Sequence, residues 1–265
     1  MKNMKFSVIV VSLNAGDELH KTVESILIQT YKDYEIIVKD GMSTDGSLEQ
    51  LPSDGRIKVV RKKDSSIYDG MNQAVMEVAG DYLIFMNCGD YFYDDKVLAR
   101  IAKEIAGYPA DIYYGNLYRR IQKTVDESPR EITDFVCFRN IPCHQACVYD
   151  KKMFHKRGYD LQYPVRADYE HFLRCRYEEQ AVFHYMPVVV ASYEGGGFSE
   201  TRNNLKRAAE EHERITKKYL GKKCYIYRGI MIITLQPLRR WIAENPYLAG
   251  GYQKIKSLIY GQHKQ

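Results

Sequence analysis

The sequence predicts an α/β protein in which a mostly parallel sheet is flanked by helices. Short, nearly continuous apolar runs alternate with stretches whose apolar residues recur at helical spacing, in the order β-α-β-β-α-β over the first 90 residues. Strands of such even hydrophobicity are buried on both faces, as parallel strands are in α/β proteins. Ligands of these proteins bind at the carboxyl ends of the strands, so we expect the site there.

The elements of the first half follow from these apolar runs. Strands are predicted over residues 6–12, 34–39, 57–61 and 82–87. The first helix is expected to begin near Asp17, which would cap it. Its apolar face consists of Leu19, Val23, Ile26 and Leu27. The second helix has an apolar face formed by Ile67, Met71, Ala74, Val75 and Val78.

The second half is predicted to alternate in the same way. Helices are expected over residues 95–106 and 168–178, strands over 111–119 and 181–193, and a highly charged helix over 199–219, with Ser199 as its cap. We expect one large domain over residues 1–220. Residues 221–265 are expected to form a separate, basic helical appendage.

Composition limits the class of protein. The chain has 265 residues, of which 45% are hydrophobic and 28% charged, as in an ordinary soluble globular protein. Its six cysteines are too few and too irregularly spaced for a disulfide framework. The apolar run at the start is too short for a signal peptide and has no small-residue cleavage site after it. We therefore expect a cytoplasmic protein with reduced thiols.

The charge is unevenly distributed along the chain. Residues 214–265 hold 11 basic side chains and one acidic side chain, a net charge of +10, whereas residues 1–213 hold 28 and 33, a net charge of −5. The apolar run at residues 230–235 is far shorter than the roughly 20 residues needed to span a bilayer. With Trp241 and several tyrosines nearby, the tail is expected to lie on an anionic membrane surface. The alternative is a tail that packs on the main domain or on another subunit.

Polar and glycine residues gather where two predicted strands end. Residues 40–46 follow the second strand and contain Asp40 and Asp45, and residues 87–90 follow the fourth and end at Asp90. Either cluster alone fits ordinary turn chemistry, but together, on one rim of the sheet, they favour a nucleotide site. No Gly-x-Gly-x-x-Gly follows the first strand and no P-loop motif occurs, so the common phosphate-binding loops are excluded.

Several of these segments, taken in order, carry a resemblance to a known family. They read FSVIVVSLN at 6–14, SILIQ at 25–29, YEIIVKDGMSTDG at 34–46 and GDYLIFMNCGD at 80–90. The chain resembles the family 2 glycosyltransferases of the GT-A fold over about residues 5–200, and within them a subgroup of bacterial polysaccharide biosynthesis. The resemblance implies sugar transfer from a nucleotide diphosphate donor to an acceptor hydroxyl, usually with inversion at the anomeric carbon.

The resemblance also implies where the donor is held. By position, Ser12, Asn14 and Asp40 resemble the residues that hold the nucleoside, and Asp64 is a further donor-binding candidate. Asp90 matches the acid of the family's Asp-x-Asp motif and is the candidate metal ligand, so the expected cofactor is Mn²⁺ or Mg²⁺. The first half of the domain would then be the donor half. A UDP-sugar is the favoured donor, with GDP- and dTDP-sugars as alternatives.

The acceptor half, residues 111–220, contains the remaining candidates that the resemblance implies. In VRADYEHFLR at 165–174, Asp168 matches the aspartate that deprotonates the acceptor hydroxyl, and its alternative role is that of a helix cap. Glu170 ranks second. His144 belongs to a His-Gln segment expected near the acceptor. Gly196 and Ser199 lie in a glycine-rich segment that is a candidate lid over the diphosphate, or an ordinary loop.

The leading hypothesis is an inverting glycosyltransferase that acts on a lipid-linked glycan in surface polysaccharide synthesis, such as capsule or O-antigen, at the inner face of the cytoplasmic membrane. Two alternatives are a catalytically inactive relative that acts as a scaffold and a nucleotidyltransferase. The latter would require a basic glycine-rich loop after the first strand, where residues 12–17 contain no lysine or arginine. The acidic main body argues against a nucleic-acid partner.

Overall fold

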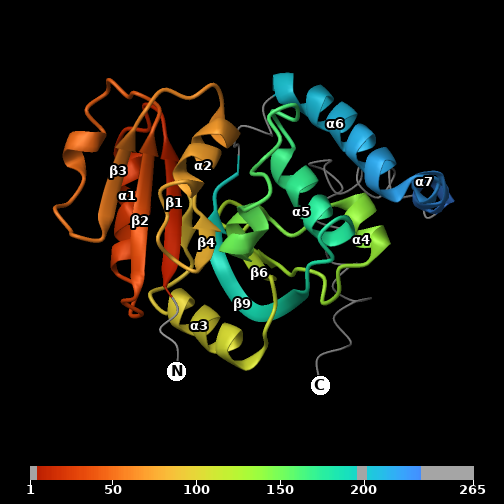
Figure 1. Ribbon diagram of the computed structural model, residues 1–265, viewed down its shortest axis with the longest axis horizontal. Helices are drawn as coiled ribbons and strands as arrows, with labels where there is room; N and C mark the ends of the chain where they lie inside the picture. The colour runs from red at the N-terminus through yellow and green to blue at the C-terminus, as the bar shows by residue number, and fades with distance from the viewer. Residues whose placement is uncertain (1–4, 196–201, 234–265) are drawn as a thin grey trace. The chain divides into compact units, whose positions relative to one another are not determined.

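The computed structural model describes residues 5–195 and 202–233, and the chain divides into two compact units, residues 1–215 and 216–265. Figure 1 shows the elements in chain order. The described residues of the first unit form a nine-stranded sheet with the main strand order β3-β2-β1-β4-β8-β6-β9-β5, and β7 pairs with β6 at one side. This unit carries all the candidate residues described below.

The first half of the sheet is parallel, as the sequence predicts. It consists of β1 (Phe6–Ser12), β2 (Tyr34–Asp40), β3 (Ile57–Arg61) and β4 (Tyr82–Phe85). β1 pairs with β2 on one side and β4 on the other, and β3 pairs with β2. Ser12 lies opposite Asp40 in the register, so the two strands end at the same level. Their polar ends therefore lie next to each other on one rim.

The second half of the sheet mixes both directions. Its strands are β5 (Tyr91–Phe92), β6 (Ile112–Arg119), β7 (Thr124–Asp126), β8 (Cys147–Asp150) and β9 (Phe183–Tyr193). β8 runs antiparallel to both β4 and β6, while β6 and β9 are parallel. The short strands β5, β7 and β8 were not among the predicted elements, because two to four residues are too few to show a period.

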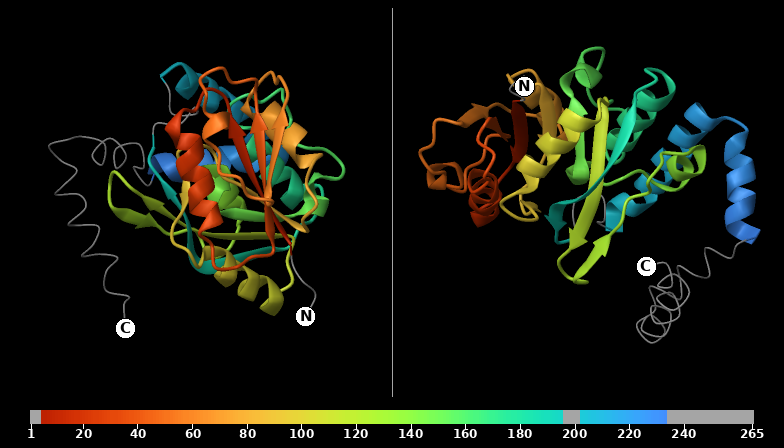
Figure 2. Two further views of the ribbon diagram at one scale, coloured as in Figure 1. Left: turned by 90° about the vertical axis from the view of Figure 1, so that its left-hand side faces the viewer. Right: turned by 90° about the horizontal axis from the view of Figure 1, so that it is seen from below.

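Helices cover both faces of the sheet. They are α1 (Asp17–Leu27), α2 (Ile67–Val75), α3 (Val97–Gly107), α4 (Asp134–Arg139), α5 (Ala167–Tyr177) and α6 (Arg202–Leu220). The even-numbered side chains of β1 share a core with α1 and α3, whereas Val11 faces α2 at Gly70. In the left view of Figure 2, α1 in red and α2 in orange lie on opposite sides of the first strands.

The start of α1 differs from the expectation that Asp17 caps this helix. Gly16, with φ 52°, is the N-cap of α1, and Asp17 is already helical, so the predicted cap was wrong by one residue. Gly16 fits because its left-handed backbone conformation costs glycine little. The backbone N–H of Gly16 donates to Asp45 Oδ2 at 2.8 Å, which ties the β1–α1 loop to the loop after β2.

The second unit is described over residues 216–233. It contains the end of α6 and α7 (Lys223–Ile233), where Cys224 is buried and its thiol lies 2.9 Å from the carbonyl oxygen of Thr216. Among the described helices, none combines the length and the apolar character that a bilayer crossing requires. The predicted appendage boundary at 220/221 lies five residues from the boundary between the units. All six cysteines are free thiols.

Candidate active site

The ends of β1 and β2 form the first part of the site. Asp40 is fully buried, and its Oδ2 accepts hydrogen bonds from the backbone N–H groups of Met42 and Ser43, both at 2.9 Å. The backbone N–H of Asn14 donates to Ser43 Oγ at 2.8 Å, and Asn14 Oδ1 accepts from the N–H of Thr44. Asp40 and Asn14 therefore shape the loop that follows β2 and fix it to the loop that follows β1.

Asp64 lies beside this loop, held by a buried lysine. The Nζ of Lys39, whose side chain is fully buried, lies 2.6 Å from Asp64 Oδ2. Glycines flank this carboxylate on two sides. A Cβ added at Gly41 would lie 3.0 Å from Asp64 Oδ2, and a Cβ added at Gly70 would lie 3.2 Å from it. The structure thus gathers Asp64 with Asn14 and Asp40, and the Ser12 end of β1 adjoins them.

Asp90 lies in the turn after β4 and is almost completely buried. Gln145 Nε2 donates to Asp90 Oδ2 at 2.7 Å. Burial raises the pKa of Asp90 to about 6, and the Gln145 hydrogen bond and the neighbouring His144 and Arg120 only partly oppose this rise. The carboxylate of Asp90 is therefore costly to ionise until a cation or a further donor reaches it.

Asp168 lies in the first turn of α5 but does not cap that helix. The N-cap position is Arg166, and its backbone N–H and that of Val165 donate to Glu211 Oε2 at 2.8 and 3.0 Å. The Asp168 carboxylate instead points to two side chains: Tyr68 Oη donates to its Oδ1 at 2.8 Å, and His144 Nδ1 lies 3.3 Å from its Oδ2. The capping alternative for Asp168 is thereby excluded.

The electrostatics of Asp168 reflect these partners. Burial raises the pKa of its carboxyl group, but the hydrogen bonds from His144 and from the Tyr68 hydroxyl lower this pKa by more, so the net pKa lies below the usual value. Burial also raises the pKa of Tyr68 well above its ordinary value, so this phenol remains a donor. Asp168 is thus a carboxylate at neutral pH, with a side chain 20% exposed.

A single short turn links the two acids. The 3₁₀ helix His144–Ala146 places His144 against Asp168 and the next residue, Gln145, against Asp90. Residues far apart in the sequence are therefore neighbours at one rim of the sheet. His144, expected near the acceptor, contacts the candidate base Asp168, whereas Tyr68 and Gln145 were not predicted as site residues.

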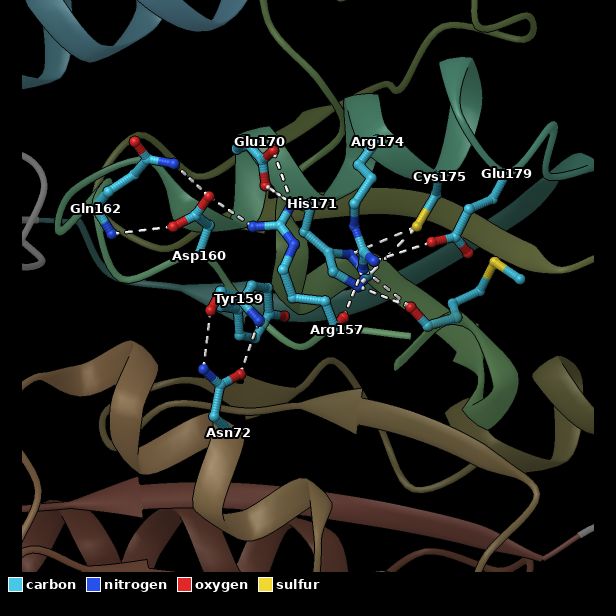
Figure 3. Close-up of polar contacts among 11 residues, drawn as sticks. Asn72, Arg157, Tyr159, Asp160, Gln162, Glu170, His171, Arg174, Cys175 and Glu179 are labelled. Carbon is cyan, nitrogen blue, oxygen red and sulfur yellow. Dashed lines mark hydrogen bonds and ion pairs between the residues drawn. The ribbon is translucent and has the colours of Figure 1, made fainter. Parts of the chain in front are cut away.

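Glu170 lies elsewhere, in the supporting structure behind α5. It is fully buried, and both carboxylate oxygens lie 2.9 Å from Arg157 Nη2 (Figure 3). In the same layer Arg174 Nη1 lies 2.9 Å from Glu179 Oε1, and Arg174 Nη2 donates to the carbonyl oxygen of Arg157 at 2.7 Å. The structure does not bring Glu170 to Asp168. Its contacts are those of a residue that anchors the 155–163 loop to α5.

Asn72 of α2 joins that loop from the other side. Its Nδ2 donates to the carbonyl oxygen of Tyr159 at 2.9 Å, and its Oδ1 accepts from the N–H of Tyr159 at 2.7 Å, as Figure 3 shows. A Cβ added at Gly158 would lie 2.1 Å from Asn72 Oδ1. This paired contact holds α2, and with it Tyr68 one turn earlier, at a fixed place relative to the acceptor half.

Arg120 connects the Asp90 turn to the end of β9. Its Nη2 donates to the carbonyl oxygen of Gly89 at 2.6 Å and its Nη1 to that of Ser192 at 2.7 Å. The guanidinium also lies 4.5 Å from the ring centroid of Tyr91. A cation next to Asp90 would therefore meet a positive side chain close by. Gly196 and Ser199, the lid candidates, lie outside the described residues.

The side chains fit a divalent cation that arrives with a phosphate ligand better than one held by protein alone. Within the described ranges, no group of three or more His, Cys, Asp or Glu side chains could hold a metal ion. Asp90 could supply one hard oxygen ligand, and burial raises its pKa although Gln145, His144 and Arg120 partly oppose the rise. Mg²⁺ and Mn²⁺ take their remaining ligands from water and phosphate oxygens.

Comparison with known proteins gives a consistent match. Residues 7–174 match the family described as Glycosyl transferase family 2. The chain is 37% identical over 204 residues to a PGL/p-HBAD biosynthesis glycosyltransferase of Mycobacterium tuberculosis, which covers 74% of this chain and 79% of that protein. An uncharacterized glycosyltransferase of the same species is 28% identical over 245 residues, or 84% of this chain and 93% of that protein.

Solved structures share the fold at low sequence identity. Staphylococcus aureus TarS 1–349 in complex with UDP aligns with a TM-score of 0.63 at 16% identity, over 90% of this chain and 78% of that chain. The mannosyltransferase PcManGT from Pyrobaculum calidifontis, in complex with GDP-Man and Mn²⁺, aligns with a TM-score of 0.60 at 14% identity, over 97% and 88%. These likenesses confirm the predicted α/β fold.

Proposed function

Because the chain belongs to glycosyl transferase family 2 and is a glycosyltransferase, we propose that it transfers a sugar from a nucleotide diphosphate donor to an acceptor hydroxyl with inversion. One observation carries this proposal: consecutive residues of one turn contact Asp168 and Asp90. The reaction requires a group that takes a proton from the acceptor and a group that offsets charge on the leaving phosphate. Asp168 is proposed as the first group, and Asp90 is proposed to hold the cation that serves as the second.

Asp168 is the general base of the proposed reaction. Its carboxylate takes the proton of the acceptor hydroxyl, the acceptor oxygen bonds to the anomeric carbon, and the bond from that carbon to the phosphate oxygen breaks. The electron pair leaves with the nucleoside diphosphate. Tyr68 and His144 each contact one oxygen of Asp168, which holds the carboxylate in orientation, and its low pKa keeps it ionised at neutral pH.

Asp90 is the proposed protein ligand for a divalent cation. When bound, Mn²⁺ or Mg²⁺ would neutralise charge that develops on the departing diphosphate. The positive charge of Arg120 lowers the pKa of Asp90, and Arg120 donates to the carbonyl oxygen of the preceding residue, Gly89. It therefore adds positive charge next to Asp90. Gln145 orients the Asp90 carboxylate, and the buried position of Asp90 strengthens its attraction for a cation.

The nucleoside end is proposed to lie at the ends of β1 and β2, where Ser12, Asn14, Asp40 and Asp64 gather. Asp64, 11% exposed, is the carboxylate best placed to accept from a base or ribose, whereas Asp40 holds the loop. Neighbours in fold bind UDP or GDP-Man. We propose a UDP-sugar as donor, with GDP- and dTDP-sugars as the alternatives that the experiment separates.

The acceptor is proposed to be a lipid-linked glycan of surface polysaccharide synthesis, reached at the inner surface of the membrane. Support comes from the composition of residues 214–265, which include 11 basic side chains and one acidic side chain. In α7, Ile226 and Ile233 are 62% and 80% exposed and lie seven residues apart, hence on one side of the helix. Exposed apolar side chains together with positive charge favour anionic lipid.

A donor screen tests the proposed function. UDP-, GDP- and dTDP-sugars are added to the wild-type protein and to Asp90→Asn, with and without Mn²⁺, and the melting temperature and binding heat are measured. One donor is expected to stabilise the wild type by roughly 2.7 kcal/mol at a hundredfold excess over Kd, with a cation-dependent part absent in Asp90→Asn. Failure of every donor to bind the folded protein with Mn²⁺ present would favour a scaffold.

Transfer itself is tested with the donor so identified. Radiolabelled donor is incubated with bacterial membrane lipids, and the labelled product is isolated for NMR of its anomeric configuration. Inversion and an extractable lipid product are expected, and both should be lost in Asp168→Asn while donor binding persists. A water-soluble glycan as the sole product would contradict the lipid-linked acceptor, and a retained configuration would contradict the assignment of Asp168 as base.

A further inference from the structure

A chain of side-chain contacts runs from the end of β4 to the proposed base. Asn87 Nδ2 lies 3.1 Å from His144 Nε2, and His144 Nδ1 lies 3.3 Å from Asp168 Oδ2. The three residues come from β4's end, the 3₁₀ turn and α5. His144 is only 13% exposed on its side chain, so its ring is held between two polar partners away from bulk water.

The chemistry of the three groups fixes the direction of both hydrogen bonds. The amide nitrogen of Asn87 can only donate, so His144 Nε2 must be the nitrogen with a free lone pair. In a neutral imidazole the other nitrogen then carries the hydrogen. His144 Nδ1 therefore donates to Asp168, and the carboxylate receives a hydrogen bond without the ring having to be charged.

We propose that Asn87 and His144 are positioning residues for the Asp168 base: Asn87, which donates to Nε2, reinforces the Nδ1–H tautomer of His144 that the Asp168 carboxylate also favours, and this tautomer holds Asp168 in its catalytic orientation. This inference rests on the proposed function. Lone pairs decide which group takes the proton. The single lone pair of His144 Nε2 is used by Asn87, whereas His144 and Tyr68 use one lone pair on each oxygen of Asp168 and leave others for an acceptor hydroxyl.

The inference also gives a reason for asparagine at position 87. A carboxylate there would accept from His144 Nε2 rather than donate to it, so the ring would need a proton on both nitrogens. The resulting imidazolium would lie between two carboxylates and draw Asp168 into an ion pair that weakens it as a base. An amide at position 87 avoids this, and it leaves Asp90 as the carboxylate of the turn.

Several titratable groups surround Asp168 and act on it together with His144. The phenols of Tyr68 and Tyr159, the thiol of Cys147 and the guanidinium of Arg166 interact with Asp168 from α2, the 155–163 loop, β8 and the residue before α5. The remaining groups coupled to Asp168 are Cys143, Tyr149 and His171. His144 and Tyr68 are the two that hydrogen-bond to the Asp168 carboxylate, so their removal can be compared directly.

The decisive measurement does not depend on activity. ¹⁵N-histidine-labelled protein is examined by NMR near pH 7.5, and the His144 resonances are assigned by their loss in His144→Asn. The nitrogen shifts report which ring nitrogen carries hydrogen. The expected result is the Nδ1–H tautomer in the wild type and a measurable share of the Nε2–H tautomer in Asn87→Ala, where only Asp168 still favours Nδ1–H. An Nε2–H tautomer in the wild type, or an unchanged tautomer in Asn87→Ala, would overturn the proposal.

Steady-state kinetics of His144 variants provide a second test of the proposal. His144→Ala is expected to lower kcat about 10- to 100-fold, less than the roughly 10²- to 10⁴-fold contribution of a general base, with little change in the KM for donor. The acid limb of kcat/KM should move to higher pH, because burial then raises the pKa of Asp168 without opposition from His144. His144→Asn, whose amide nitrogen replaces Nδ1, should restore most of kcat and return the limb toward its wild-type position.

The two arms separate this inference from the proposed function. If no donor supports transfer but His144 shows the Nδ1–H tautomer reinforced by Asn87, the proposed reaction fails and the contact chain stands as a structural one. If transfer is observed and His144→Ala and His144→Asn lose the same activity with the same pH profile, the reaction stands and the positioning role is overturned. A matched Tyr68→Phe variant should move the acid limb in the same direction as His144→Ala.

Discussion

At the scale of single residues, the two acids of the site have opposite properties. Asp168 has a lowered pKa because His144 and Tyr68 stabilise its charge despite burial, whereas burial raises the pKa of Asp90 to about 6. Environments that separate the pKa values of two acids are typical of active sites in which the acids do different work. In the proposed reaction the ionised Asp168 accepts a proton, whereas Asp90 binds a cation in its charged form.

The pKa of Asp90 predicts how the unliganded protein and its cation complex respond to pH. A raised folded pKa means that this group stabilises the fold below its unfolded pKa, near 3.8, and that this contribution is lost as pH rises through about 6. Cation binding requires the charged form. The gain in Tm from Mn²⁺ with donor should therefore be small at pH 5 and larger at pH 7.5.

The matched control is Asp90→Asn, whose amide oxygen still accepts from Gln145. This variant should show no cation-dependent gain in Tm at any pH. Without ligand, its stability should also lack the part of the pH dependence that Asp90 causes. A cation-dependent gain that is equal at pH 5 and pH 7.5 in the wild type would show that Asp90 is not the ligand.

A second prediction concerns Asp168 itself. Asp168→Asn should lower kcat roughly 10²- to 10⁴-fold and leave donor affinity within about twofold, because the base contacts the acceptor rather than the donor. Single-turnover rates and donor calorimetry check the two parts separately. A parallel loss of donor affinity would place Asp168 at the donor instead.

At the scale of elements, α2 joins the two halves of the domain. Asp64 precedes it, Tyr68 reaches Asp168 from its first turn, and Asn72 binds both backbone polar groups of Tyr159. The rings of Tyr68 and Tyr159 lie 5.3 Å apart, centroid to centroid. Donor-side and acceptor-side residues therefore depend on the same helix for their spacing.

This joint predicts a non-additive pair of substitutions. Asn72→Ala should destabilise the fold by about 1–3 kcal/mol, because buried groups of Tyr159 lose their partners. Gly158→Ala should cost about 1–3 kcal/mol, because its Cβ would overlap Asn72 Oδ1. In the Asn72→Ala background Gly158→Ala should cost much less, since the overlapping atom is gone. Urea denaturation of the four proteins measures this, and additive losses would contradict the contact.

The sequence predicts the elements well where a period exists. The runs at β1, β2 and β3 and the apolar stripes of α1 and α2 coincide with the structure, because burial on one face leaves a repeated pattern. The site is only partly predictable in this way. The resemblance predicts Asp168, His144 and Asp90 as site residues, but neither Tyr68 nor Asn87 is among the predicted site residues. Their contacts span 57 to 100 residues of sequence and depend on tertiary packing, which no local pattern encodes.

At the scale of the whole molecule, the chain consists of two compact units of opposite charge. The second unit, residues 216–265, holds ten basic side chains and one acid, the first unit holds 29 and 33, and the proposed catalytic residues all lie in the first unit. Catalysis and any attachment to a surface are therefore assigned to separate units. Substitutions in α7 should change where the protein binds without changing how it binds donor.

The double variant Ile226→Gln with Ile233→Gln tests this division. Both side chains are more than half exposed, so the fold and donor binding should be unchanged, whereas affinity for phosphatidylglycerol vesicles should fall about tenfold or more. Met76→Gln, an 83% exposed apolar residue of the first unit, is the matched control and should bind vesicles like the wild type. Equal vesicle binding by all three proteins in a sedimentation assay would contradict membrane attachment through α7.

The turn that contains His144 and Gln145 has a consequence for how such a catalyst can diverge. Adjacent residues contact the proposed base and the proposed cation ligand, so these two acids are linked through one peptide unit, whose Cα atoms lie about 3.8 Å apart. The proposed nucleoside site is built from other residues, at the ends of β1 and β2. The preferred nucleotide can therefore change through substitutions there that leave the link between Asp168 and Asp90 intact.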